Sequence, residues 1–132
     1  MEIFPDDLLY SREHLWVRVE GNLATIGLTD YAQERMGEIL SLDLPECDAD
    51  VERDEPFGSI ESTQAVVELI APVGGVVISV NEDLIDDIGV INSDPHDTGW
   101  LVVVEVEDPE ELDDLLDPQG YQDFVIDEGG GD

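Results

Sequence analysis

The sequence contains no lysine. Its four basic residues are all arginines, against 35 aspartates and glutamates, and the formal net charge is −31 at pH 7. Contacts to nucleic-acid phosphates require clusters of Lys and Arg that this chain cannot assemble. The same charge repels anionic membrane surfaces. Binding to nucleic acid and binding to a membrane are therefore excluded as functions.

Cysteine and long apolar runs are also scarce. The single Cys47 cannot form an internal disulfide. No apolar run approaches the length of a membrane span. The start of the chain, MEIFPDDLLY, lacks the basic residues of a signal peptide. We expect a cytoplasmic protein.

The carboxylates are spread over nearly every expected loop instead of forming one run. A local acidic run is typical of a tail or a metal site. An evenly acidic surface without lysine instead favours hydration where salt screens the repulsion. We therefore hypothesise that the protein comes from the cytosol of an extreme halophile.

The length and hydrophobic content predict one folded domain. The chain has 132 residues, of which 42% are hydrophobic, enough for a core in a domain of this size. We place a single domain at residues 1–126. Residues 127–132, DEGGGD, are expected to form a disordered acidic tail.

Apolar residues alternate with polar ones in several short segments, a pattern typical of half-buried strands. Val76, Ile78 and Val80 are expected on one face of such a strand. The predicted strands lie on both sides of the turn at 21–22, at 40–44, on both sides of the polar segment 61–65, at 76–80 and at 100–106.

Short helices are predicted between and after these strands. Thr29 or Asp30 can cap a helix of about two turns that ends at Gly37. Two C-terminal helices begin at Asp108-Pro109 and at Asp117-Pro118. Glu111 is expected to complete a capping box in the first of these. The irregular loop 81–99 is expected to be pinned to the core by its apolar pairs at 84–85 and 90–91.

Many short strands with small flanking helices favour a barrel or a sandwich. Four segments in this order resemble the H-protein family of the glycine cleavage system, the lipoyl carrier of that complex. They are SREHLWVRV, IGLTDYAQERMGEILSLDLPE, GSIESTQAVVELIAPVGGVVISVNEDL and VINSDPHDTGWL. The resemblance implies a mainly β fold, a flattened β-barrel or sandwich of the biotinyl/lipoyl carrier type with short flanking helices.

In the family that the chain resembles, a hairpin tip presents a lysine that carries lipoate in amide linkage. The lipoyl arm accepts an aminomethyl group from glycine decarboxylase and delivers it to aminomethyltransferase. Glu61, Ser62, Thr63 and Ala65 match the tip pattern, but Gln64 stands in place of the lysine.

Glutamine at this position changes the chemistry. Lipoylation requires an amine with a free lone pair, whereas the lone pair of the Gln64 amide nitrogen is delocalised into its carbonyl. The chain contains no lysine elsewhere that could accept the lipoyl group, and arginine stays protonated. We expect no lipoyl cofactor on this chain.

Other candidate sites give weaker signals. Glu61 and Glu68 lie on opposite arms of the hairpin, but no nucleophile accompanies them, so they do not indicate an enzyme. His14 and His96 lack metal-ligand spacing, so no metal site is expected. Cys47 has no cationic neighbour that would activate it.

The remaining acidic and aromatic residues are interpreted as structural. The acidic pairs 86–87, 113–114 and 6–7 lack the glycine-punctuated spacing of a calcium loop and are interpreted as hydrated surface. Trp16 and Trp100 are expected to fill the barrel and its rim.

Three functions remain open at this stage. The first is a homologue without lipoyl-lysine that works as a non-catalytic binding module, docking to glycine decarboxylase, aminomethyltransferase or lipoate-handling proteins through the hairpin. The second is an authentic carrier altered at one position. The third, an enzyme, has no support in the sequence.

Overall fold

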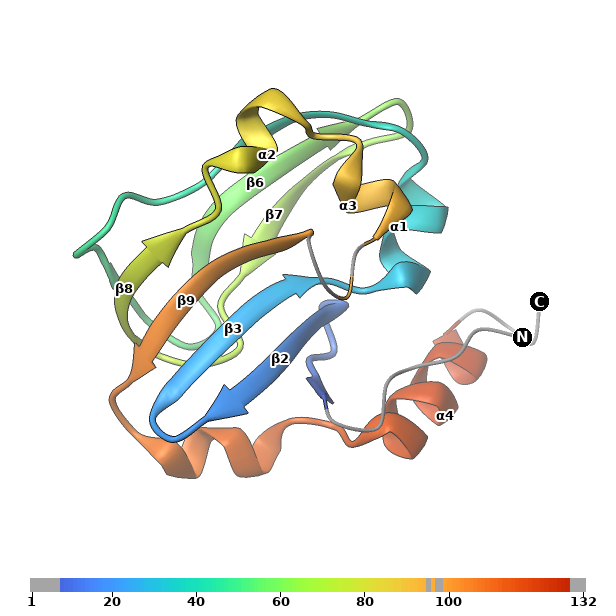
Figure 1. The fold of residues 1–132 in the computed structure, drawn as a ribbon. Helices are drawn as coiled ribbons and strands as arrows, with labels where there is room; N and C mark the ends of the chain where they lie inside the picture. Colours follow the sequence, from blue (N-terminus) through green and yellow to red (C-terminus); the bar gives the residue numbers. More distant parts are fainter. Residues whose placement is uncertain (1–7, 95, 97–98, 129–132) are drawn as a thin grey trace.

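The computed structural model describes residues 8–94, 96 and 99–128, which form two antiparallel sheets with short helices around them (Figure 1). The larger sheet has the strand order β1-β2-β3-β9-β8-β5 and the smaller has the order β4-β6-β7. The strands are β1 (Leu9–Tyr10), β2 (Leu15–Glu20), β3 (Leu23–Leu28), β4 (Ile39–Asp43), β5 (Asp50–Val51), β6 (Pro56–Ser62), β7 (Val66–Ile70), β8 (Gly75–Val80) and β9 (Trp100–Val106). The helices are α1 (Asp30–Met36), α2 (Asp83–Asp86), α3 (Val90–Ser93), the 3-10 helix η1 (Pro109–Asp114) and α4 (Pro118–Glu128).

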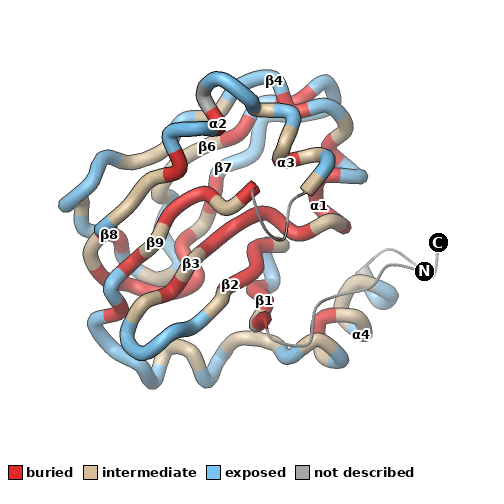
Figure 2. The backbone as a smooth tube through the Cα atoms, viewed as in Figure 1, coloured by how far each residue is buried: buried red, intermediate tan, exposed pale blue. Residues whose placement is uncertain are grey.

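The two sheets face each other and do not join into one closed barrel. The expected mainly β fold with short flanking helices is confirmed, in its sandwich form. The strands predicted around the turn at 21–22, around the tip 61–65 and at 100–106 are all present. Figure 2 shows that buried segments concentrate on the strands between the sheets, while the outer loops are exposed.

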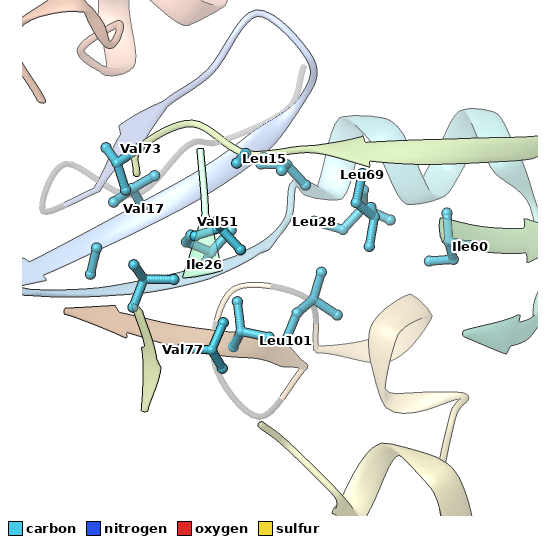
Figure 3. Packing of buried hydrophobic residues seen from close by; sticks show 14 of the residues in the cluster. Leu15, Val17, Ile26, Leu28, Val51, Ile60, Leu69, Val73, Val77 and Leu101 are labelled. Atoms are coloured by element: carbon cyan, nitrogen blue, oxygen red, sulfur yellow. The ribbon is translucent and has the colours of Figure 1, made fainter. Parts of the chain in front are cut away.

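The main core lies between the two sheets (Figure 3). Val17, Ile26 and Leu101 of the larger sheet are at most 1% exposed, and so is Ile60 of the smaller sheet. This core holds the hairpin β6–β7 against the rest of the molecule, because Leu69 of β7 is buried in the same cluster. The hairpin therefore packs as part of the domain.

A second buried cluster lies outside the main core and corrects the expectation for Trp16. Consecutive strand residues point to opposite faces, so Val17 enters the main core while Trp16 enters a cluster with Tyr10 and Tyr121. The rings of Tyr10 and Tyr121 stack with centroids 4.7 Å apart and join β1 to α4. Trp100 is partly buried and packs against this second cluster, so neither tryptophan fills the space between the sheets.

Two strands differ from the predicted alternation. In β4, Ile39 is buried and Leu40 is 51% exposed, with an irregular register between Ile39 and Ser41. In β8, Val77 is buried and Ile78 is 44% exposed, and the register shifts between Val77 and Ser79. Val80 packs against the main core, so the expectation that Val76, Ile78 and Val80 share one face is wrong, because the bulge breaks the alternation between Ile78 and Val80.

The predicted helix signals are largely confirmed. Thr29, not Asp30, caps α1, because its side chain accepts a hydrogen bond from the amide of Ala32 at 3.2 Å. Asp108 caps η1 in the same way. Glu111 does not complete a capping box; it accepts a hydrogen bond from the amide of Gly74 at 2.8 Å.

The loop between β8 and β9 is more regular than expected, since it contains α2 and α3. Leu84 and Ile91 are 2% and 0% exposed, which confirms that apolar residues pin this segment to the core. At the C-terminus, α4 includes Asp127 and Glu128, which were expected in the tail. Residues 129–132 lie outside the described residues. Within the described part of the chain, no helix is long and apolar enough to cross a membrane.

Candidate functional site

The tip of the hairpin β6–β7 is held in shape by Ser62. This residue is 7% exposed, and its hydroxyl accepts hydrogen bonds from the amides of Gln64 and Ala65, each at 3.2 Å. The Ser62 hydroxyl also donates to the carbonyl of Ala65 at 3.2 Å, and the Ser62 amide donates to the same carbonyl at 2.9 Å. Serine supports such turns because one hydroxyl replaces several backbone contacts. The turn does not depend on the side chain of residue 64.

The tip is also fixed to the segment that follows α1. The amide of Thr63 donates to the carbonyl of Glu38 at 3.0 Å. Gly37 has a φ of +78°, and a Cβ on it would lie 2.7 Å from the Thr63 hydroxyl oxygen and 3.4 Å from Cγ of Gln64. Only glycine fits both this backbone conformation and this close approach. Gly37 therefore ends the helix, as predicted, and the tip packs directly against it.

Asn92 of α3 fixes the segment 37–39 that contacts the tip, which we call the seat of the tip. Its Oδ1 accepts from the amide of Ile39 at 3.0 Å, and its Nδ2 donates to the carbonyl of Gly37 at 2.8 Å and to Oε1 of Gln33 at 2.9 Å. One side chain thus connects α1, the start of β4 and α3. The hairpin tip rests on a polar network whose members come from three separate parts of the chain.

Gln64 is exposed at this rigid tip, together with Thr63 and Ala65. The adjacent residues of β7 extend the exposed surface: Val66 is 71% exposed and Val67 is 40% exposed. Glu61, also exposed, accepts a hydrogen bond from the Ser41 hydroxyl at 3.1 Å. The tip therefore presents a neutral amide beside the apolar side chain of Val66, with carboxylates nearby. Such a surface suits contact with another protein.

The tip offers no catalytic arrangement. Glu61 pairs with Val66 and Glu68 pairs with Ser59, so the two carboxylates occupy diagonal positions on the hairpin. A lone carboxylate pair without a nucleophile or an oxyanion donor does not form an acid–base centre. Across the described residues, no group of three or more His, Cys, Asp or Glu side chains is arranged to hold a metal ion.

His14 packs against aromatic rings of α1 and α4. Its Nδ1 lies 2.8 Å from the hydroxyl of Tyr121, which in turn lies 2.8 Å from the hydroxyl of Thr29. This chain of contacts ties α4 to the cap of α1. His14 thus contributes to the packing of the C-terminal helix.

The environment of His96 predicts how the stability of the fold depends on pH. Its Nε2 accepts a hydrogen bond from the amide of Asp30 at 3.2 Å, which requires an unprotonated Nε2. Burial lowers the pKa of His96, and Arg18 lowers it further, whereas the carboxylates of Asp30 and Asp94 act in the opposite direction. Because the folded-state pKa lies below the ordinary value, the unfolded chain takes up the proton first as the pH falls. The contribution of His96 to stability is full above an unfolded pKa of about 6.5 and is lost as the pH falls through the folded pKa.

The measurement is urea denaturation at pH 7.5 and 5.5 of the wild type and of His96→Gln, which keeps an acceptor for the Asp30 amide. Between the two pH values, the free energy of unfolding of the wild type should fall relative to that of the variant. Carboxylates titrate in both proteins and cancel in this difference. Parallel pH dependence of the two proteins would contradict the prediction.

The structure brings residues 61–65 together at one tip, as the sequence predicts. It adds Gly37, Glu38 and Asn92, whose contacts with the tip or its seat no pattern in the sequence indicated. Gly37 gave a local signal, but only as a helix end. Asn92 lies within the segment VINSDPHDTGWL that carries part of the family resemblance, and this was the one signal that could have drawn attention to it.

Comparisons with known proteins identify related chains. A family model described as glycine cleavage H-protein matches residues 8–128. A glycine cleavage system H protein from Brevibacillus brevis is 50% identical over 122 residues, 92% of this chain and 97% of that protein. The H protein of Halalkalibacterium halodurans is 44% identical over 128 residues, 97% of this chain and 100% of that protein. The crystal structure of the H protein from Mycobacterium marinum superposes with a TM-score of 0.83 at 30% identity and covers 96% of this chain and 99% of that chain.

Proposed function

The chain belongs to the glycine cleavage H-protein family, and from that premise we propose that it is a non-catalytic docking module that carries no lipoyl group. Its partners are enzymes of glycine cleavage, namely glycine decarboxylase or aminomethyltransferase, or lipoate-handling proteins. The observation that carries the proposal is a glutamine on an otherwise intact, exposed hairpin tip.

The chemistry of the tip supports this function. The Gln64 amide nitrogen is not a nucleophile, and the sequence contains no lysine that could replace it. Ser62 and Gly37 nevertheless keep the tip in a rigid, presented form. A surface that keeps its shape but lacks the reactive amine suits binding without group transfer.

An authentic carrier altered at one position is the second candidate. It is favoured by the retained turn and seat of the tip, which a protein with an unrelated role would not need. The two candidates differ in genomic context: a second H-protein with an intact lysine in the same organism favours the docking module, and a sole copy favours the altered carrier.

The docking function predicts competition in a reconstituted glycine cleavage reaction. The wild-type chain alone should support no turnover above the blank without carrier. Added in excess to a lysine-bearing H-protein, it should lower the rate, because it occupies the same enzyme surface without transferring a group. The assay measures glycine-dependent CO₂ release at several concentrations of the chain, at a salt concentration that the enzymes tolerate.

Two matched variants locate the competing surface. Val66→Asp places a charge on the exposed hairpin, and Ile126→Asp places the same charge on the exposed face of α4, where Ile126 is 54% exposed. The first should abolish the competition and the second should leave it unchanged. Turnover by the wild type alone, or absence of any competition, would reject the docking function within glycine cleavage.

A further inference from the structure

A large groove lies on the opposite side of β4 from β6. It has a volume of about 750 Å³ and runs between β4 with the segment that follows it and the junction of β8 with α2. Its lining consists of residues 40–47 on one side and Val80, Asn81, Glu82, Leu84 and Ile88 on the other. Among the described residues, none from the hairpin tip 61–65 lines it.

The strand β4 presents its backbone edge to this groove. A strand that faces a groove lines it with alternate residues, whereas the consecutive β4 residues from Leu40 to Asp43 all take part, and residues 44–47 beyond the strand continue the wall. β4 is also an end strand of its sheet, with β6 as its neighbour on the other side. The edge of an end strand carries backbone groups that can pair with an additional extended segment.

The groove has an apolar interior and an acidic rim. Leu84 is 2% exposed, and the other apolar lining residues on the interior side are partly buried and pack on the main core: Leu42, Leu44, Val80 and Ile88. Exposed carboxylates surround this interior, from Asp43 and Glu46 on one side and Glu82 on the other. None of the four arginines lines the groove. The complementary ligand is therefore apolar on one face and cationic on the other.

We propose that this groove binds an extended, basic segment of a partner protein, which adds to the edge of β4 as a further strand. Alternate apolar side chains of the segment fill the groove over Leu42 and Leu84. Its Lys or Arg side chains meet Asp43, Glu46 and Glu82. Backbone pairing supplies affinity, and the alternation of apolar and basic residues supplies specificity. This inference does not rest on the proposed function of the hairpin tip, because the two surfaces share no residue.

The probe for the test is a synthetic six-residue peptide in which lysine and valine alternate, with both ends blocked. Its control has the same composition, with three lysines followed by three valines. Binding is measured by calorimetry in 1 M potassium chloride, where the Debye length is ~3 Å and the general attraction of an acidic chain for cations is largely screened. We expect the alternating peptide to bind and the control peptide to bind at least about tenfold more weakly.

Two N-methylated versions of the alternating peptide test backbone pairing. In one, methyl groups block the amides on one edge of the extended peptide; in the other, they block the opposite edge. An added strand pairs through one edge only, so one version should bind and the other should not. If both bind like the parent, or if both fail to bind, strand pairing at β4 is rejected.

Two variants that leave the net charge unchanged test whether the peptide binds in the groove. Leu40→Ser removes an apolar side chain from the edge of the groove, and Ile126→Ser removes a similarly exposed one from α4; Leu40 and Ile126 are 51% and 54% exposed. The first should weaken binding about fivefold to tenfold, and the second should leave it unchanged. Equal binding by the two variants would overturn the proposal, and circular dichroism would verify that both are folded.

Cys47 gives a second readout, because it lines the groove and is exposed. Saturation with the alternating peptide should slow alkylation of the Cys47 thiol by the neutral reagent N-ethylmaleimide, while the control peptide should not. An unchanged alkylation rate at saturation would place the peptide elsewhere on the protein and reject the groove as its site.

Discussion

Gln64→Lys should convert the chain from one that accepts no lipoyl group into one that accepts a single lipoyl group. The substitution supplies the amine that the wild type lacks. Gln64 is exposed, and the hydrogen bonds that shape the turn come from Ser62. A substitution at such a position usually changes the free energy of unfolding by less than about 0.5 kcal/mol. Intact-mass spectrometry after incubation with a lipoate ligase, lipoate and ATP should show one lipoyl increment on the variant and none on the wild type.

Ala65→Lys is the matched control, since it places the same single lysine one residue further along the exposed tip. We expect it to stay unmodified, because the ligase must reach a lysine held at position 64 of the turn. The reaction should be run at high salt with a ligase that tolerates it, so that the acidic surface does not repel the enzyme. A lipoyl increment on the wild type would overturn the chemical argument. An unmodified, folded Gln64→Lys beside a modified lysine-bearing H-protein would show that the hairpin has diverged toward another partner.

The melting temperature should rise strongly with salt. Thirty-five carboxylates against four arginines repel one another over the whole molecule at 0.01 M ionic strength, where the Debye length is ~30 Å, but only over ~3 Å at 1 M. Relief of ~3 kcal/mol of repulsion corresponds to a rise of ~10 °C for a domain of this size. Differential scanning calorimetry between dilute buffer and 1 M potassium chloride measures the rise. A flat response would contradict the halophile hypothesis.

Two controls separate charge screening from general stabilisation by solutes. Sucrose stabilises folded proteins by exclusion from their surface but screens no charge, so it should not reproduce the steep rise below about 0.3 M salt. A variant with Asp86→Asn, Asp87→Asn and Asp113→Asn neutralises three exposed carboxylates and should show a higher melting temperature in dilute buffer and a smaller rise. An equal rise in the variant would assign the salt effect to a cause other than charge repulsion.

The helices illustrate what could be predicted from local sequence. Asp108 was identifiable as a cap, and the cap of α1 was limited to Thr29 or Asp30, because a cap bonds to an amide two or three residues further along the chain. The strands of the hairpin followed from two apolar runs and from the polar segment between them. These signals are local, so tertiary packing had little to add to them.

The predictions of side-chain burial that were wrong concern residues whose position depends on a bulge or on a distant segment. The bulges in β4 and β8 break the apolar alternation, so that Leu40 and Ile78 are exposed whereas Leu42 and Val80 pack against the main core. Trp16 was expected in the central core, but α4 provides a second apolar cover on the other face of β2. Neither effect is visible in the pattern of a single strand, because each depends on which element packs against it.

The chemistry at position 64 and the charge of the surface were determined by the sequence alone, because the reactivity of an amide and the sign of a carboxylate belong to the residue itself. The tertiary structure alone decided how position 64 is presented. Asn92 donates a hydrogen bond to the carbonyl of Gly37, and the tip packs against Gly37. The strand β4 and the β8–α2 junction line one groove. The segments that meet in these contacts lie far apart in the chain. Such contacts depend on sheet packing and strand register, which are collective properties of the folded chain and leave no local pattern in its sequence.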